Sequence, residues 1–154
     1  RNSTEVLKKV DLVRHLGSML QGKLDALNME LSATLEARNS DGKSSAGDKH
    51  EVGRAMVQQE LDKLEEQRAK LIALQQELDR VPQDRVYDRG AFGSLVTTTN
   101  GTYFIAVGLG VIEVDGATLY AISLASPIGQ LLAGKAVGDA IVFNGRSDVI
   151  RSIG

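Results

Sequence analysis

The stretch "GDKHE" places two acidic residues, Asp48 and Glu51, three positions apart. On the first turn of a helix, side chains with this spacing share a face, so both carboxylates can reach one metal ion or its water shell. A magnesium ion engaged in phosphoryl chemistry keeps several waters and takes only one or two carboxylates from any one protein. The pair therefore has the chemistry of a partial Mg²⁺ site.

The same residues also have an ordinary structural interpretation. Aspartate at a helix start caps free backbone N–H groups and suits the helix dipole, and Glu51 would complete a pattern like a capping box. Asp41, on the other side of the turn, is either a functional acid or a turn former. His50 lies between the two acids and is interpreted as a solvated residue, not as a base.

Two long helices are needed to position these acids. Apolar residues recur in steps of three and four before the acids and again after them. The first seam contains Val6, Val10, Val13, Leu20, Leu24, Leu27 and Leu31, and the second contains Val57, Leu61, Leu64, Leu71, Leu74 and Leu78, with Arg68 as its polar member. A seam this narrow suits two helices packed on each other.

The residues between the two seams are mostly turn and cap formers. The two helices are therefore predicted to fold back on each other as an antiparallel coiled-coil hairpin over residues 1–81, with its tip near residues 39–50. Each arm of about 30 residues would be roughly 45 to 50 Å long at a rise of 1.5 Å per residue. Such a hairpin would hold the acids far from the rest of the molecule.

Residues 82–154 have a different composition, since every Phe, Tyr and Pro of the chain lies there. Short β-rich runs alternate with turn signals at Asn100, Asp115 and Asn144, each followed by glycine, and this pattern predicts strand hairpins. The segment "SPIGQLLAG" predicts one short helix, because proline stands near its start and Gly134 near its end. The predicted fold class is α+β, a helical hairpin followed by a small antiparallel β domain.

Composition excludes several kinds of function. The chain of 154 residues has a formal charge of −2, which gives no general attraction to nucleic acid or to an anionic membrane. It has no cysteine, so thiolate zinc sites, disulfides and cysteine nucleophiles are excluded. No apolar run approaches the roughly 18 residues of a membrane span, so we expect a soluble cytoplasmic protein. A serine nucleophile such as Ser126 would lack a base, because residues 82–154 contain no histidine.

The segment "ASPIGQLLAGKAVGDAIVF", residues 125–143, resembles the C-terminal signature of the bacterial Gre transcript-cleavage factors. "FGSLVTT" from Phe92 resembles the first strand of that family's FKBP-like domain. The resemblance implies an FKBP-like fold for residues 82–154 and a docking face on RNA polymerase. We assign this partner-binding face to Ser126, Pro127, Ile128, Gly134 and Lys135.

The resemblance also implies a role for the tip, which in the family reads Gly-Asp, two residues, then Glu. The globular domain would dock at the rim of the polymerase secondary channel, on the β′ subunit, and the hairpin would reach the active centre. Asp48 and Glu51, with Asp41 as a further candidate, would help hold the second Mg²⁺ ion, shared with the polymerase, during cleavage of backtracked RNA. The protein would then be a monomeric factor that stimulates the nuclease activity of polymerase and is not itself an enzyme.

Two alternatives stay open. Val52 stands where the family generally has an amide, and Lys43 and Lys49 place positive charge beside the acids. A protein of the same fold could therefore bind the secondary channel as a regulator without cleavage activity. In the second alternative, the coiled coil and the β domain form an adaptor module for an unrelated partner.

Overall fold

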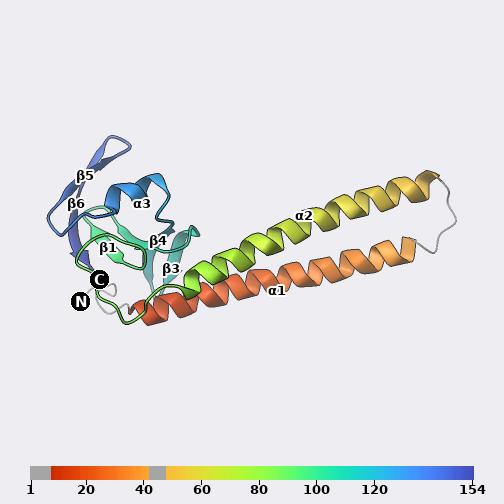
Figure 1. Cartoon of the computed structure of the whole chain (residues 1–154), viewed down its shortest axis with the longest axis horizontal. Helices are drawn as coiled ribbons and strands as arrows, with labels where there is room; N and C mark the ends of the chain where they lie inside the picture. Colours follow the sequence, from red (N-terminus) through yellow and green to blue (C-terminus); the bar gives the residue numbers. More distant parts are fainter. Residues whose placement is uncertain (1–7, 42–47) are drawn as a thin grey trace. The chain divides into compact units, whose positions relative to one another are not determined.

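The computed structural model describes residues 8–41 and 48–154, and of residues 40, 41 and 48–50 it describes the backbone alone. Two long helices come first in the chain and six strands with one short helix follow (Figure 1). The elements are α1 (Lys9–Asp41), α2 (Asp48–Asp79), β1 (Leu95–Thr98), β2 (Thr102–Ile105), β3 (Gly110–Val114), β4 (Ala117–Ile122), α3 (Pro127–Leu132), β5 (Ala140–Phe143) and β6 (Arg146–Ile153). The predicted α+β class and the helical hairpin are confirmed.

Contacts divide the chain into two units. The helical unit is Gly17–Gln76, and the β unit contains the described residues up to Leu16 together with Glu77–Gly154. The ends of α1 and α2 thus have their contacts within the β unit, whereas composition predicted a boundary near Pro82. Whether residues 1–81 and 82–154 are separable domains stays a prediction.

The helical unit is held by a narrow leucine seam, as the spacing predicted. Its buried members are Leu20, Leu24, Leu27, Leu61 and Leu64. Nearly all surrounding positions are exposed or half-buried, so the seam is the unit's only continuous apolar contact among the described residues. Burial of such side chains contributes about 1.5 to 3 kcal/mol each.

Three hydrogen bonds between side chains fix the register of the two helices. Gln75 donates to Gln21 (2.9 Å), Arg68 Nε donates to Asn28 Oδ1 (3.0 Å), and Arg38 Nη1 donates to Gln58 Oε1 (3.2 Å). The two residue numbers have the same sum in all three pairs. A residue further along α1 therefore pairs with a residue equally further back along α2. The helices are therefore antiparallel, and Arg68 bonds to an asparagine of the opposite helix.

The predicted seam is wrong at the start of α1. Val10 was placed in the seam, but its side chain is 44% exposed, whereas Leu12 and Leu16 are fully buried. The first residues of α1 belong to the β unit, so they are buried by a different set of neighbours and the apolar face changes phase. Val6 lies outside the described residues.

The β unit contains a six-stranded sheet in the order β3-β4-β2-β1-β6-β5. Its neighbouring strands pair antiparallel, as predicted, except that β2 and β4 pair parallel. This pairing arises because the chain leaves β2, forms the outer strand β3 first, and returns as β4 into the place beside β2. The sheet is therefore mixed.

Two of the three predicted hairpin turns have the backbone that their sequences favour. Asp115 and Gly116 both have positive φ (51° and 81°), as do Asn144 and Gly145 (53° and 77°). Positive φ at both central residues is the signature of the type I′ turn, which suits the twist of paired strands. These turns make the β3–β4 and β5–β6 hairpins.

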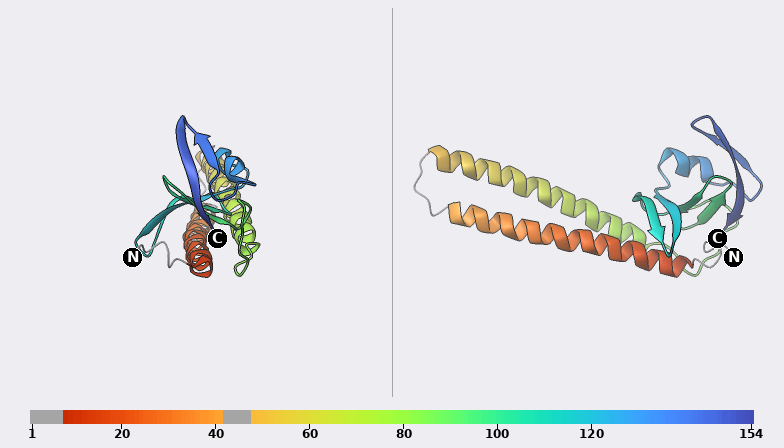
Figure 2. Two further views of the ribbon diagram at one scale, coloured as in Figure 1. Left: turned by 90° about the vertical axis from the view of Figure 1, so that its left-hand side faces the viewer. Right: turned by 180° about the vertical axis from the view of Figure 1, so that it is seen from behind.

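Helix α3 covers part of one face of the sheet (Figure 2). The core between them is a cluster of six buried residues, namely Val96, Ile105, Ile128, Leu132, Ile141 and Ile150. Ser126 is the N-cap of α3 and Pro127 is its first residue, so the predicted start of the helix is confirmed. Within residues 8–41 and 48–154, no helix is long and apolar enough to cross a membrane.

Candidate functional site

The end of the helical hairpin carries the acids that the sequence singled out. Asp41 is the last residue of α1 and Asp48 is the first of α2, while Glu51 lies in the first turn of α2. The side chains of Asp41 and Asp48 lie outside what the structure describes, as does Gly47 entirely. The backbone therefore gives Asp48 and Glu51 the helical spacing on which the metal-ligand prediction rests, and the ligand role itself stays a prediction.

Glu51 is the one acid of this set whose side chain is described. It is exposed, and it forms no hydrogen bond or ion pair with any residue whose side chain the structure describes. No group of three or more His, Asp and Glu residues in the described chain is arranged to hold a metal ion. A carboxylate with no intramolecular partner keeps its oxygen lone pairs available for an outside ligand.

The predicted docking residues on α3 have structural roles of their own. The Ser126 hydroxyl accepts from the Gly129 N–H (3.1 Å) and donates to the Ser123 carbonyl (2.7 Å). Ile128 is 8% exposed and packs in the core, so its side chain is not a free surface. Pro127 is exposed at the first position of the helix. Of these three, Pro127 alone offers a fully exposed side chain.

Gly134 and Lys135 join the end of α3 to Gly90 through backbone hydrogen bonds. The Gly134 N–H donates to the Gly90 carbonyl (2.8 Å), and the Gly90 N–H donates to the Lys135 carbonyl (2.9 Å). A Cβ atom at Gly90 would lie 2.0 Å from the Leu132 carbonyl oxygen, so only glycine fits there. Partner binding by these residues stays a prediction, and their backbone is fully used in holding the fold.

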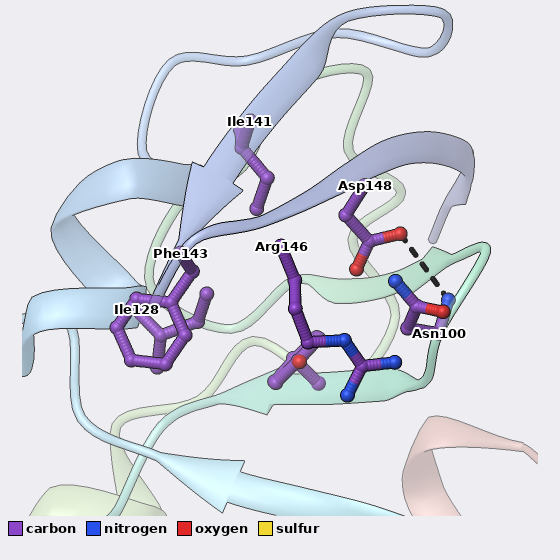
Figure 3. Close-up of a pocket in the computed structure, with 7 residues that line it drawn as sticks. Asn100, Ile128, Ile141, Phe143, Arg146 and Asp148 are labelled. Carbon is purple, nitrogen blue, oxygen red and sulfur yellow. Dashed lines mark hydrogen bonds between the residues drawn. The ribbon is translucent and has the colours of Figure 1, made fainter.

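A second candidate site, which the sequence did not indicate, is a cleft in the β unit. It is lined by Asn100, Tyr103, Ile128, Ile141, Phe143, Arg146 and Asp148, and its volume is about 60 Å³. Figure 3 shows Phe143 and Ile128 on one side of the cleft, and Arg146, Asp148 and Asn100 on the other. The site therefore combines an apolar surface with a charged rim.

Asp148 is the most heavily hydrogen-bonded side chain of the cleft, and it is only 7% exposed. Its carboxylate accepts from the hydroxyls of Thr98 (2.7 Å) and Thr99 and from the backbone N–H groups of Asn100 (3.2 Å) and Val149 (3.0 Å). The carboxylate thus organises the chain between β1 and β2 from a neighbouring strand. The predicted hairpin between β1 and β2 is present, but Asn100 and Gly101 are shaped by these bonds and do not adopt the type I′ backbone that Asn-Gly favours.

The pKa values of the cleft follow from this arrangement. Burial by itself raises the pKa of Asp148, but the hydrogen bonds from Thr99, Thr98, Asn100 and Val149 favour the charged form, so the pKa lies below its ordinary value. Burial raises the pKa of Tyr103, and the nearby charge of Asp148 adds to the rise. Asp148 is therefore a carboxylate, and Tyr103 a neutral phenol, at neutral pH.

One signal in the sequence could have indicated the buried acid. Asp148 and Ile150 are two positions apart in a strand, so they point to the same face of the sheet. Ile150 is an apolar residue of the inner face, so Asp148 should also be buried on that face. A buried carboxylate needs several hydrogen-bond donors. Three of the four donors come from residues 98 to 100, which a single sequence does not place beside residue 148.

Comparisons with known proteins give no family for this chain. No protein-family model and no curated protein matches the sequence. One structure of the transcription factor Gfh1 is similar to this chain with 20% identity and a TM-score of 0.36, covering 88% of this chain and 89% of its own. A crystal structure of Thermus aquaticus Gfh1 is similar with 19% identity and a TM-score of 0.34, covering 96% of each chain. Likeness this low assigns no function.

Proposed function

We propose that this protein is a transcription elongation factor of the Gre type, which binds RNA polymerase at its secondary channel. The observation that carries the proposal is the antiparallel hairpin of two helices of 33 and 32 residues, with Asp41 and Asp48 at the two helix ends that meet its turn. A paired rod with acids at its end suits a protein that delivers charge to a remote centre. Support also comes from the resemblance of residues 125–143 to the Gre signature.

In this proposal, Asp48 and Glu51 are ligands for a Mg²⁺ ion that is shared with the polymerase. They fit such an ion because magnesium prefers carboxylate oxygens and needs only one or two from one protein. When bound, the ion would activate the water that attacks the RNA phosphate. The residues of this chain supply negative charge and orientation, while the polymerase supplies the rest of the active site and the RNA 3′ end.

The β unit holds the protein on its partner in this account. Pro127 and Lys135 have side chains at least partly accessible to solvent, near the two ends of α3, and they are the best candidates for contact with the β′ subunit. Binding and chemistry would then lie in different units. Loss of the tip acids should leave the affinity for polymerase unchanged.

A transcript-cleavage assay on a backtracked elongation complex tests the proposal. Added protein should release short 3′ RNA fragments from the stalled transcript, faster than the polymerase alone. If the protein binds polymerase but releases no fragments, it is the secondary-channel regulator without cleavage activity. The immobilised protein should also retain polymerase from a bacterial lysate. If it does not, the adaptor alternative replaces both the cleavage factor and the secondary-channel regulator.

A further inference from the structure

The cleft of the β unit contains a positive charge that its own fold does not neutralise. Arg146 is exposed, and its guanidinium forms no hydrogen bond or ion pair with any residue in the described ranges. Asp148 is two positions away on the same strand and lines the same cleft, yet its carboxylate is occupied by two hydroxyls and two backbone N–H groups. The nearby negative charge is thus committed to the fold, and Arg146 is left available for an anion from outside.

Strand pairing places an apolar residue beside each of these two charged residues. Phe143 is directly opposite Arg146 across the β5–β6 hairpin, and Ile141 is directly opposite Asp148. Directly opposed residues share a face of the sheet, so both pairs border one cleft (Figure 3). Ile141 is 4% exposed, and it forms the apolar floor with Ile128 from α3.

The size of the cleft limits what can fill it. Small-molecule pockets are commonly about 300 to 1,000 Å³, and a cavity of about 150 Å³ holds a benzene ring. A volume of about 60 Å³ is too small for an aromatic ring or a nucleotide. It suits a branched aliphatic group of three carbons, such as the side chain of valine.

We propose that this cleft is a binding site for a carboxylate that carries a short branched aliphatic group. The aliphatic group lies against Ile128, Ile141 and Phe143, and the carboxylate accepts hydrogen bonds from the Arg146 guanidinium. A guanidinium matches a carboxylate with two parallel N–H donors, which fixes its orientation. The ligand is either a free branched carboxylic acid or the C-terminal residue of a peptide chain. The site does not depend on polymerase binding.

NMR titration of the 154-residue chain tests this site. Isovalerate is the probe, and isovaleramide, its neutral counterpart of the same shape, is the control. Isovalerate should shift the backbone amide signals around Ile141, Phe143 and Arg146 in a saturable way, and isovaleramide should bind at least tenfold more weakly. Equal binding of the two compounds, or no saturable shift with isovalerate, would overturn the proposal.

A matched pair of variants separates this site from general attraction to positive charge. Arg146→Gln should weaken isovalerate binding at least tenfold, whereas Arg151→Gln should leave it unchanged, because Arg151 is exposed on the same strand but does not line the cleft. Equal losses in the two variants contradict the site.

A short peptide ending in valine, with a free or an amidated C-terminus, identifies the source of the carboxylate. Tighter binding of the free-ended peptide than of isovalerate indicates a chain end, and weaker binding indicates a small molecule.

Discussion

Asp148 in the β unit and Glu51 in the helical unit are both acids close to a turn, but the fold uses them differently. Asp148 is buried and accepts four hydrogen bonds, which hold the chain between β1 and β2 in place. Glu51 is exposed in the first turn of α2 and has no partner among the residues whose side chains are described. One carboxylate is part of the structure, and the other is exposed, as an acid that binds a ligand outside the chain must be.

The difference gives a general criterion for acids in this protein. A buried acid that accepts several hydrogen bonds contributes to stability, and its loss should be seen in unfolding experiments. An exposed acid without partners contributes little to stability, so its loss should be seen only in function. The following predictions test the comparison from the largest expected effect to the smallest.

The largest effect is expected at the end of the hairpin. Asp48→Ala together with Glu51→Ala should slow transcript cleavage on the order of 100-fold, because preorganised charge at a reacting phosphate is worth that much in comparable sites. The stability of the protein should fall by no more than about 1 kcal/mol, the contribution of a helix cap. The measurement is the rate of 3′ fragment release from a backtracked polymerase complex.

Glu65→Ala is the matched control for the tip variants, since Glu65 is also exposed on α2 but lies far along the helix. It should cleave at the wild-type rate. Wild-type cleavage by the double variant would remove the metal-ligand role from Asp48 and Glu51 and direct attention to Asp41.

The second prediction concerns the buried acid. Asp148→Asn should lower the free energy of unfolding of the β unit by about 2 to 4 kcal/mol, because an amide replaces one acceptor oxygen by a donor and leaves N–H and O–H groups unpaired. Tyrosine fluorescence in urea reports this unit alone, since all three tyrosines of the chain lie in it. Glu113→Gln, at an exposed position of β3, should change the stability by less than about 0.5 kcal/mol. Equal stability of the two variants would contradict the structural role of Asp148.

The pH dependence of the unfolding free energy should also show the structural role of Asp148. The pKa of Asp148 in the folded protein lies below its ordinary value of 3.8, so its charged form stabilises the fold above that pH. This contribution should disappear as the pH falls from about 4 through the lower pKa of the folded state. Urea unfolding at pH 7, 4 and 3 should therefore show a smaller loss of stability on acidification in Asp148→Asn than in the wild type. An identical loss in both proteins would assign the acid sensitivity to other carboxylates.

The smallest effect is expected at the start of α3. Ser126→Ala should destabilise the β unit by about 1 kcal/mol, because it removes the hydroxyl that accepts from the Gly129 N–H. Ser147→Ala, at an exposed position of β6, is the control and should have little effect. If Ser126→Ala keeps full stability but lowers the affinity for polymerase, Ser126 contacts the partner and its role as a cap is secondary.

The parts of the fold that local patterns control were predicted well from the sequence. The leucine spacing predicted both helices, and Asp115 and Asn144, each followed by glycine, predicted two hairpins, which form with type I′ turns. In these cases the residues that determine the structure lie within a few positions of one another. Periodicity failed at Val10, because the neighbours that bury the start of α1 are distant in sequence.

The features that were missed depend on pairing between distant segments. β4 pairs parallel with β2 because β3, which comes first in the chain, takes the outer position in the sheet and β4 the position beside β2. No short sequence pattern predicts this strand order. The predicted hairpin at Asn100 is present, but its turn is not the type I′ turn that Asn-Gly favours, because hydrogen bonds to Asp148, 48 positions away, give it another shape. The cleft around Arg146 was missed for the same reason, since its lining comes from β2, β5, β6, α3 and the loop at Asn100, which are distant in sequence.

The absence of cysteine from the chain allows the most direct test of the account. Ala55→Cys lies one turn beyond Glu51 and leaves both candidate ligands intact, so an iron chelate attached there would mark the position of the hairpin end. Ala73→Cys lies roughly 27 Å further along α2 and is the control. In a backtracked polymerase complex, the label at position 55 should cut the RNA close to its 3′ end, and the label at position 73 should not. Absence of RNA cutting from position 55, or stronger cutting from position 73, would contradict delivery of the acids to the active centre.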